Sequence, residues 1–332
     1  MRIDSSATPR LKRRGILRRF YKSLSVKNLY SMYFKQRTIA APVNCSGVGV
    51  HSGKKVNVTI KPAPCNHGIK FIRTDLPDCP EISAHFNMVV DTSLATVIGY
   101  EGFIVSTIEH LMASFAGLAI DNALVEIDAH EMPIMDGSAG PFTSLIKSAG
   151  IENQDAPKCF FVVKEPIEIK KDGKMVGIYP HPNYKITCTI EYDHPLIKKQ
   201  SYSVDISDHV FEREISRART FGFVHEYEYL KRYGLARGVS LENVIAIDTE
   251  DVLNDEGLRY KDEFVRHKIL DCIGDFSLLG MPILGHVVAS KSGHAFNHVF
   301  LRKFFAQKES WETLIINDLN ELPSIQSKSL AI

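Results

Sequence analysis

The segment FVRHKILDCIGDFSLLG, residues 264–280, constrains the fold more than any other part of the chain. Its apolar residues recur at roughly helical spacing, which predicts a buried helix over 264–279. His267, Asp271 and Asp275 recur every four residues along the same segment. Side chains four apart lie one above the other on a helix, so these three form a polar stripe. An otherwise apolar helix therefore carries an imidazole and two carboxylates, which packing alone does not explain.

The rest of the pattern predicts an α+β protein of two similar domains. Strands are expected at 54–63, 121–129, 160–170, 175–180, 185–192, 243–248, 284–290 and 293–296, and helices at 106–118, 141–151, 208–216, 264–279 and 297–309. Each half mixes a sheet with about two helices, and the order is not a strict βα alternation. The polar stretch ENQDAPK at 152–158 is interpreted as the junction between domains of residues 35–157 and 158–328.

Composition excludes several classes of protein. Hydrophobic residues at 44% and charged residues at 24% are typical of a soluble globular chain, and 332 residues suffice for two domains. The six cysteines contain no C-x-x-C pair, which argues against a disulfide framework or a cysteine zinc site and fits a reducing compartment. No apolar run approaches the roughly 18 residues of a membrane span. A cytoplasmic protein without a transmembrane segment is expected.

The net charge of +1 hides a basic amino-terminal arm. Residues 1–37 carry 11 Lys and Arg against Asp4 alone, and the rest carries 29 basic and 38 acidic residues. The arm is not a secretory signal, because arginines interrupt any apolar core: Arg13, Arg14, Arg18 and Arg19. A transit peptide, a membrane-surface arm and a nucleic-acid arm each fit its charge. We favour a disordered extension over 1–34, or a true start at Met32, because the globular pattern begins near Lys35.

Two segments carry the residue types of a metal site. His267 and Asp271 can reach one ion from one helix face, although this spacing also fits a hydrogen-bonded pair or a surface salt bridge. Glu109 and His110 lie in the first turn of the helix expected at STIEHL. The helix amino terminus favours a neutral His110 able to bind metal, and Glu109 is a carboxylate placed to take a proton from water. Ser106 and Glu109 also fit a simple capping box.

Three further segments have candidate functional side chains. His294, in KSGHAFNH, falls in an expected loop, where functional side chains are often placed. In SRARTFGF, Thr220 supplies a hydroxyl and Phe221 an apolar ring. The D-G-S sequence at 136–138 is interpreted as a structural turn before a helix.

Together these segments resemble the UDP-3-O-acyl-N-acetylglucosamine deacetylases of Gram-negative lipid A biosynthesis. The motifs that carry the resemblance, in family order, are SGVGVHSGKKVNVTIKPAP, STIEHL, GLAIDNALVEI, PIMDGSAGPF, SRARTFGF, DEFVRHKILDCIGD and KSGHAFN. The similarity runs from about Lys35 to about Trp311, and weakly to the carboxyl terminus, so only the basic arm lies outside it, which agrees with a start at Met32.

The resemblance implies a zinc amidase with one catalytic Zn²⁺. Its three metal ligands match His110, His267 and Asp271, and three protein ligands leave a fourth position for water. Its general base matches Glu109. A second catalytic histidine, protonated and acting on the oxyanion or the leaving amine, matches His294.

The resemblance also implies supporting roles. Asp275 matches the carboxylate that orients and charges that histidine, and Thr220 matches a hydroxyl that binds the oxyanion. Lys268 and Phe221 match residues that hold the sugar end of the substrate, and Lys174, in KKDGK, matches a basic residue near the nucleotide phosphates. The implied fold is two α+β domains with the site between them. An apolar passage for the acyl chain would be lined by the stretch from RTFGF to YLKRYGLARGVS.

The expected reaction is hydrolysis of the 2-acetamido group of a UDP-linked, 3-O-acylated glucosamine, which releases acetate. A monomer that binds this substrate and no nucleic acid is expected. Two alternatives remain. An inactive binding or regulatory homologue would be expected to lose a metal ligand or the base, and all are present. A nucleic-acid-binding protein would show salt-dependent binding that disappears when residues 1–31 are removed.

Overall fold

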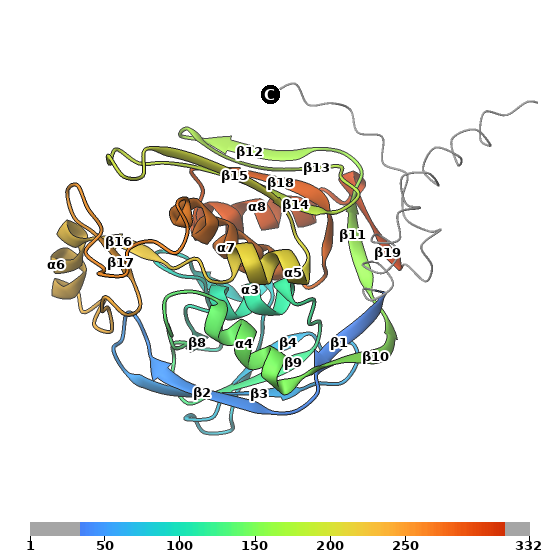
Figure 1. Ribbon diagram of the computed structural model, residues 1–332. Helices are drawn as coiled ribbons and strands as arrows, with labels where there is room; N and C mark the ends of the chain where they lie inside the picture. Colours follow the sequence, from blue (N-terminus) through green and yellow to red (C-terminus); the bar gives the residue numbers. More distant parts are fainter. Residues whose placement is uncertain (1–33, 316–332) are drawn as a thin grey trace, which may run out of the picture.

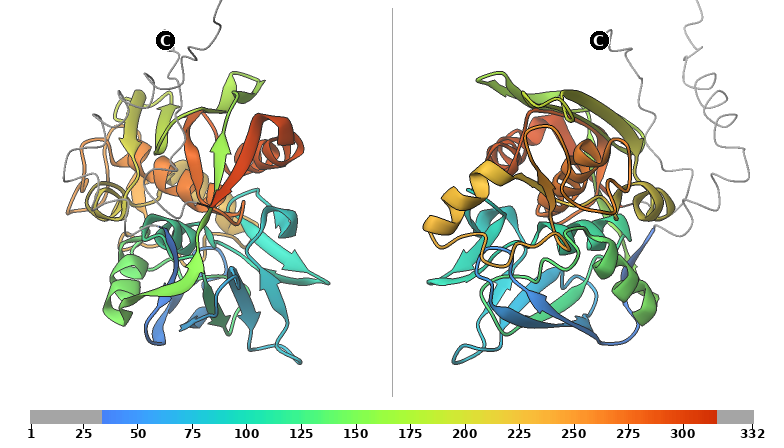
Figure 2. Two further views of the ribbon diagram at one scale, coloured as in Figure 1. Left: turned by 90° about the vertical axis from the view of Figure 1, so that its right-hand side faces the viewer. Right: turned by 60° about the vertical axis from the view of Figure 1, so that its left-hand side comes forward.

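The computed structural model describes residues 34–315, so the basic arm and the start at Met32 lie outside the described residues. The architecture is α+β, as predicted, with two sheets as outer layers and helices between them (Figure 1). In both views of Figure 2 the blue-to-green strands of the first half lie below the orange and red elements of the second. Within 34–315, no helix is long and apolar enough to cross a membrane.

The first half forms one main sheet and a small meander. The main sheet has the order β2 (Val43–Val48), β3 (Lys55–Pro62), β9 (Ala123–Ile127), β4 (Ile69–Arg73) and β5 (Glu81–Ser83). The meander contains β6 (Val89–Asp91), β7 (Val97–Tyr100) and β8 (Phe103–Val105), and a 3₁₀ turn, η1 (Phe86–Met88), precedes it. Strand β3 buries Val56, Val58 and Ile60 and exposes or half-buries the residues between them, which confirms the predicted alternation.

The second half forms a seven-stranded sheet around β18 (Ile283–Ser290). Its other strands are β11 (Cys159–Val163), β12 (Ile167–Lys171), β13 (Lys174–Tyr179), β14 (Tyr184–Glu191), β15 (Lys199–Asp205) and β19 (Trp311–Ile315). Strand β18 pairs in parallel with β11 and β14 and antiparallel with β13. The prediction of a single strand at 160–170 is wrong. The segment is two strands, β11 and β12, with Pro166, which has no N–H for a ladder, in the break.

The helices fill the space between the sheets. The main helices of this layer are α3 (Glu109–Gly117), α4 (Gly140–Ala149), α7 (Glu263–Ser277) and α8 (His294–Ala306). The helix expected at 208–216 is a short turn, α5 (Asp208–Val210), that continues as a π-helical turn, η2 (Phe211–Ile215); a 3₁₀ turn, η3 (Lys308–Ser310), precedes β19. Helix α6 (Val224–Arg232) projects at one side with β16 (Phe221–Phe223) and β17 (Ile245–Ile247) (Figure 1).

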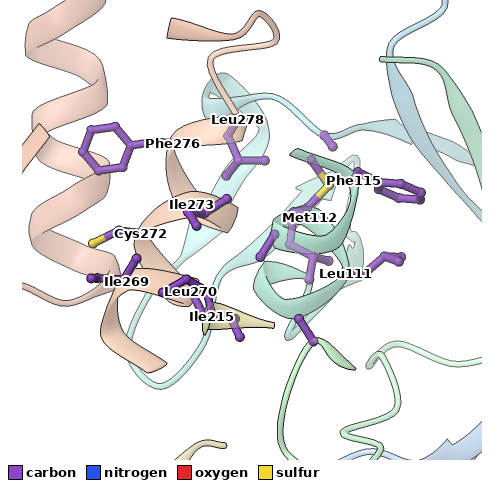
Figure 3. Packing of buried hydrophobic residues seen from close by; sticks show 14 of the residues in the cluster. Leu111, Met112, Phe115, Ile215, Ile269, Leu270, Cys272, Ile273, Phe276 and Leu278 are labelled. Atoms are coloured by element: carbon purple, nitrogen blue, oxygen red, sulfur yellow. The ribbon is translucent and has the colours of Figure 1, made fainter. Parts of the chain in front are cut away.

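Helices α3 and α7 pack against each other at the centre of the molecule. Leu111 and Met112 of α3 lie beside Leu270 and Ile273 of α7 (Figure 3). Nearly the whole of α7 is buried, which confirms the predicted core helix. Buried apolar residues of both halves form one continuous cluster, so this helix pair joins the two halves.

One glycine permits the close crossing of these helices. A Cβ atom on Gly274 of α7 would lie 2.1 Å from the carbonyl oxygen of Glu109 on α3. No side chain fits there, because the obstacle is backbone. The crossing therefore places the first turn of α3 directly against the polar stripe of α7.

The polar stretch at 152–158 forms most of β10 (Ile151–Pro157), a largely exposed strand that pairs antiparallel with β1 (Lys35–Ile39). Two local predictions are wrong. The segment 293–296 is not a strand, because α8 begins at His294 after an extended Gly293. Neither Ser106 nor Thr107 caps α3: the helix begins after Ile108, and within residues 34–315 it has no side-chain cap hydrogen bond. The division into domains at residues 157 and 158 stays a prediction.

Candidate active site

Three predicted metal ligands converge where α3 crosses α7. The Nε2 atom of His110 lies 3.8 Å from Oδ1 of Asp271, and Nε2 of His267 lies 3.3 Å from the same oxygen. One ligand atom of each residue lies within 4.8 Å of the others, and all three residues are buried. Ligand atoms around one tetrahedral zinc ion are roughly 3.3 Å apart, so the arrangement fits a single ion.

The protonation states of this cluster also fit a metal. His267 Nδ1 lies 3.0 Å from the carbonyl oxygen of Ala218, and donation there directs the lone pair of Nε2 toward the cluster. Burial lowers the pKa of His110 to about 3 and lowers the pKa of His267, so both imidazoles are neutral. Burial acts to raise the pKa of Asp271, but the positive charges of Lys268 and His294 hold it below its usual range. Two neutral imidazoles and one carboxylate are the forms that bind a divalent cation.

Glu109 stands beside this cluster at the start of α3. Its Oε2 accepts a 3.1 Å hydrogen bond from the backbone N–H of Thr96, and its Oε1 lies 3.7 Å from Nε2 of His294. Burial raises the pKa of this carboxyl to about 7, although the charge of His294 opposes the shift. A group with this pKa exchanges protons readily near neutral pH.

His294 is the first residue of α8, not a loop residue as expected. Its Nδ1 lies 2.9 Å from Oδ2 and 3.1 Å from Oδ1 of Asp275, one turn beyond Asp271 on α7. Burial opposes a charge on the ring, but Asp275 and Glu109 raise the pKa of His294 to about 10. The imidazole is therefore a cation at neutral pH, and its Nε2–H points toward the Glu109 side.

The segment before β16 is fixed to the start of α7. The guanidinium of Arg219 lies 2.9 Å from the carboxylate of Glu263, and both side chains are buried. The next residue, Thr220, is half-buried, and its backbone N–H donates to the carbonyl of Gly137. The D-G-S segment at 136–138 forms the predicted turn, in which Asp136 accepts from Ser138. Among residues 34–315, no hydrogen bond joins the Thr220 hydroxyl to the metal-ligand cluster.

Two predicted substrate residues border the cluster. Lys268 Nζ donates a 2.9 Å hydrogen bond to Oδ2 of Asp271 and stands 5.6 Å from the centre of the Phe221 ring. The Phe221 ring packs edge to face on Phe264, at 5.0 Å between ring centres. A cation beside an apolar ring can bind a polar ligand that also has an apolar face.

Lys174 is not brought into this group. It is an exposed residue at the start of β13, and no described contact joins it to the cluster.

A cavity of about 520 Å³ lies at the other ends of α3 and α7. It is lined by residues such as Phe115, Ile273 and Phe276, and by none from 219–240, the stretch expected to line an acyl passage. The passage stays a prediction.

The sequence interpretation missed two residues of the site. Thr96 precedes β7 and contacts Glu109, Asp275 and His294, yet nothing in the local sequence distinguishes it. Asn297 donates a 2.8 Å hydrogen bond from Nδ2 to Oδ2 of Asp275. On a helix that begins at residue 294, Asn297 lies on the same face as His294, three residues away. The sequence pattern did not predict this helix start, so it did not indicate Asn297.

Comparison with known proteins gives a consistent result. A model of the UDP-3-O-acyl N-acetylglycosamine deacetylase family matches residues 36–306. The UDP-3-O-acyl-N-acetylglucosamine deacetylase of Myxococcus xanthus is 51% identical over 279 residues, which cover 84% of this chain and 89% of the relative. The Chromohalobacter salexigens enzyme of that name is 48% identical, with 86% and 94% covered, and the Teredinibacter turnerae one is 46% identical, with 89% and 98% covered. The chain therefore belongs to the UDP-3-O-acyl N-acetylglycosamine deacetylase family.

Proposed function

We propose that this chain hydrolyses the 2-acetamido group of UDP-3-O-acyl-N-acetylglucosamine and releases acetate, as a cytoplasmic enzyme of lipid A biosynthesis. The observation that carries the proposal is the convergence of a His-His-Asp cluster with the buried pair Glu109 and His294, in a chain of this family. Amide hydrolysis needs an electrophile for the carbonyl, a base for water and an acid for the amine. The site contains residues for each requirement.

One zinc ion held by His110, His267 and Asp271 is part of the proposal. Two imidazole nitrogens and one carboxylate oxygen form a three-ligand set of the kind used by catalytic zinc sites. When bound, zinc polarises a carbonyl and lowers the pKa of water. Lys268 occupies the other oxygen of Asp271, which leaves Oδ1 directed to the two histidines.

Glu109 is proposed as the general base. Its pKa of about 7 leaves a substantial ionised fraction at neutral pH, and that form accepts the proton of the attacking water. The backbone N–H of Thr96 binds Oε2, so the carboxylate has one fixed oxygen and one available. The neighbouring His294 cation stabilises the ionised form.

His294 is proposed as the general acid. With Nδ1 bound to Asp275, the ring presents Nε2–H, which donates a proton to the leaving amine or a hydrogen bond to the oxyanion. The Thr220 hydroxyl is proposed as a second donor to the oxyanion. Lys268 and Phe221 are proposed to hold the sugar, and Lys174 the nucleotide phosphates. The acyl chain would follow the 219–240 stretch.

The test is a deacetylase assay on the purified chain with its metal content measured. The wild type should release acetate from UDP-3-O-acyl-N-acetylglucosamine, and substrates of several acyl lengths give the preference. Glu109→Gln should keep the metal and lose about 10²–10⁴-fold in kcat. Glu152→Gln, at an exposed position on β10, is the control and should change neither the metal content nor kcat. A metal-loaded wild type that leaves the acetamido group intact would overturn the proposal and favour a binding homologue.

A further inference from the structure

Thr96 is buried, with 2% of its surface exposed, in the loop between β6 and β7. Its position beside the acid–base groups is not explained by the roles proposed so far. Each of its three polar groups bonds to a different part of the site. The N–H donates to Oε2 of Glu109 at 3.1 Å, and the carbonyl accepts from the N–H of Ile108 at 3.4 Å. The hydroxyl donates to Oδ1 of Asp275 at 2.6 Å and lies 3.2 Å from Nδ1 of His294.

We propose that Thr96 is a positioning residue that holds the base Glu109 and the His294–Asp275 acid in one geometry. The inference rests on the proposed function, because it takes these groups as base and acid. The two groups come from different helices: Glu109 from α3, and the acid from α7 and α8. Thr96 belongs to none of these helices and bonds to both sides.

The hydroxyl fixes the plane of the Asp275 carboxylate. Oδ2 already receives His294 Nδ1 at 2.9 Å and Asn297 Nδ2 at 2.8 Å. Oδ1 has the Thr96 hydroxyl at 2.6 Å and only a longer contact, 3.1 Å, with His294. Without the hydroxyl, Oδ1 loses its best donor in a buried place, where an unsatisfied acceptor is costly. The carboxylate then rotates toward other donors, and the imidazole bound to it turns with it.

A small rotation is sufficient to affect turnover. His294 Nε2 and Glu109 Oε1 are separated by 3.7 Å. The reacting atoms must be within hydrogen-bond reach of both groups, so the positions of the two side chains matter. A misplacement of about 1 Å can cost about 100-fold in rate. No described hydrogen bond joins Thr96 to a metal ligand, so metal binding should not depend on its hydroxyl.

The test compares three variants of the metal-loaded full chain. Thr96→Val keeps the shape and removes the hydroxyl, and it should lower kcat about 10- to 100-fold with little change in KM and the same metal content. Thr96→Ser keeps the hydroxyl and should recover most of kcat. Thr59→Val, on β3 in the distant sheet, is the matched control and should behave as the wild type. A Thr96→Val enzyme with wild-type kcat, or a Thr96→Ser enzyme as slow as Thr96→Val, would overturn the inference.

A double-mutant cycle tests the route through Asp275. If Thr96 acts through this carboxylate, Thr96→Val should cost less than about 2-fold in kcat when added to Asp275→Asn, whereas independent effects multiply. Multiplying effects would overturn the inference while the proposed function stands. If the wild type shows no deacetylase activity, the proposed function fails, and the same cycle is read from urea unfolding midpoints. Non-additive midpoints then support the positioning contact, and additive midpoints refute it.

Discussion

Gly274→Ala tests whether the helix crossing positions the site. The added Cβ would lie 2.1 Å from the Glu109 carbonyl oxygen, whereas ordinary contact begins near 3.4 Å. The difference means that α7 and α3 must separate locally by about 1.3 Å. This overpacking lowers the unfolding free energy by about 1–3 kcal/mol. The higher helix propensity of alanine raises it by roughly 1 kcal/mol. Because the obstacle is backbone, we take the upper end of the cost and expect the unfolding free energy to fall by about 2 kcal/mol.

The same separation moves Glu109 and His110 away from the stripe on α7. A shift of about 1 Å between catalytic groups can cost about 100-fold, so kcat should fall by about that factor. Urea unfolding measures the change in unfolding free energy, and acetate release at saturating substrate measures the change in kcat. Metal content should be measured in parallel, because His110 is one of the proposed ligands.

Gly222→Ala is the control for adding a methyl group, since its Cβ would meet only Val244 Cγ1, at 3.9 Å. It should not lose stability. A Gly274→Ala protein with wild-type stability and turnover would refute the argument altogether. A protein that loses stability and keeps its kcat would show that the crossing supports the core but does not position Glu109.

Three further outcomes are expected. His267→Ala should lose metal and activity together, and metal analysis of a fully active variant with one ion per chain would contradict the site. The pH–rate profile should be bell-shaped: activity rises near pH 7 as Glu109 ionises and falls near pH 10 as His294 loses its proton, with each limb assigned by mutation. Glu263→Ala should lower the unfolding free energy by about 3 kcal/mol, because it removes the buried carboxylate partner of Arg219 and leaves the guanidinium only Glu256 and the Gly257 carbonyl, and an unchanged urea midpoint would contradict this.

Local sequence patterns predicted the elements with strong periodicity. The core helix at 264–279, the alternating strand β3 and the helices near 106–118 and 141–151 are all present within a few residues. The helix period also predicted that His267, Asp271 and Asp275 share one face, since this follows from spacing alone. Glycine at 150, with φ of 79°, ends α4 as expected.

Patterns failed where pairing or packing decides the structure. The polar stretch at 152–158 has no apolar alternation, yet it is a strand because β1 offers it a partner 116 residues away in sequence, as between Arg37 and Asn153. The local residues at 293–296 predict a strand, although α8 begins at His294 and packs against α7. Neither outcome is encoded in the local residues.

By itself the sequence determined the chemistry available to this protein: which imidazoles, carboxylates and hydroxyls it has, and which of them share a helix face. Only the tertiary structure decided which of these meet across elements. Thr96 reaches Asp275 over 179 residues and His294 over 198, and no periodicity relates such positions. Their contact depends on two helices approaching closely at Gly274 and on a loop that packs into the crossing. Burial at that crossing then sets the pKa values of Glu109 and His294, because desolvation and neighbouring charge act only once the chain has folded.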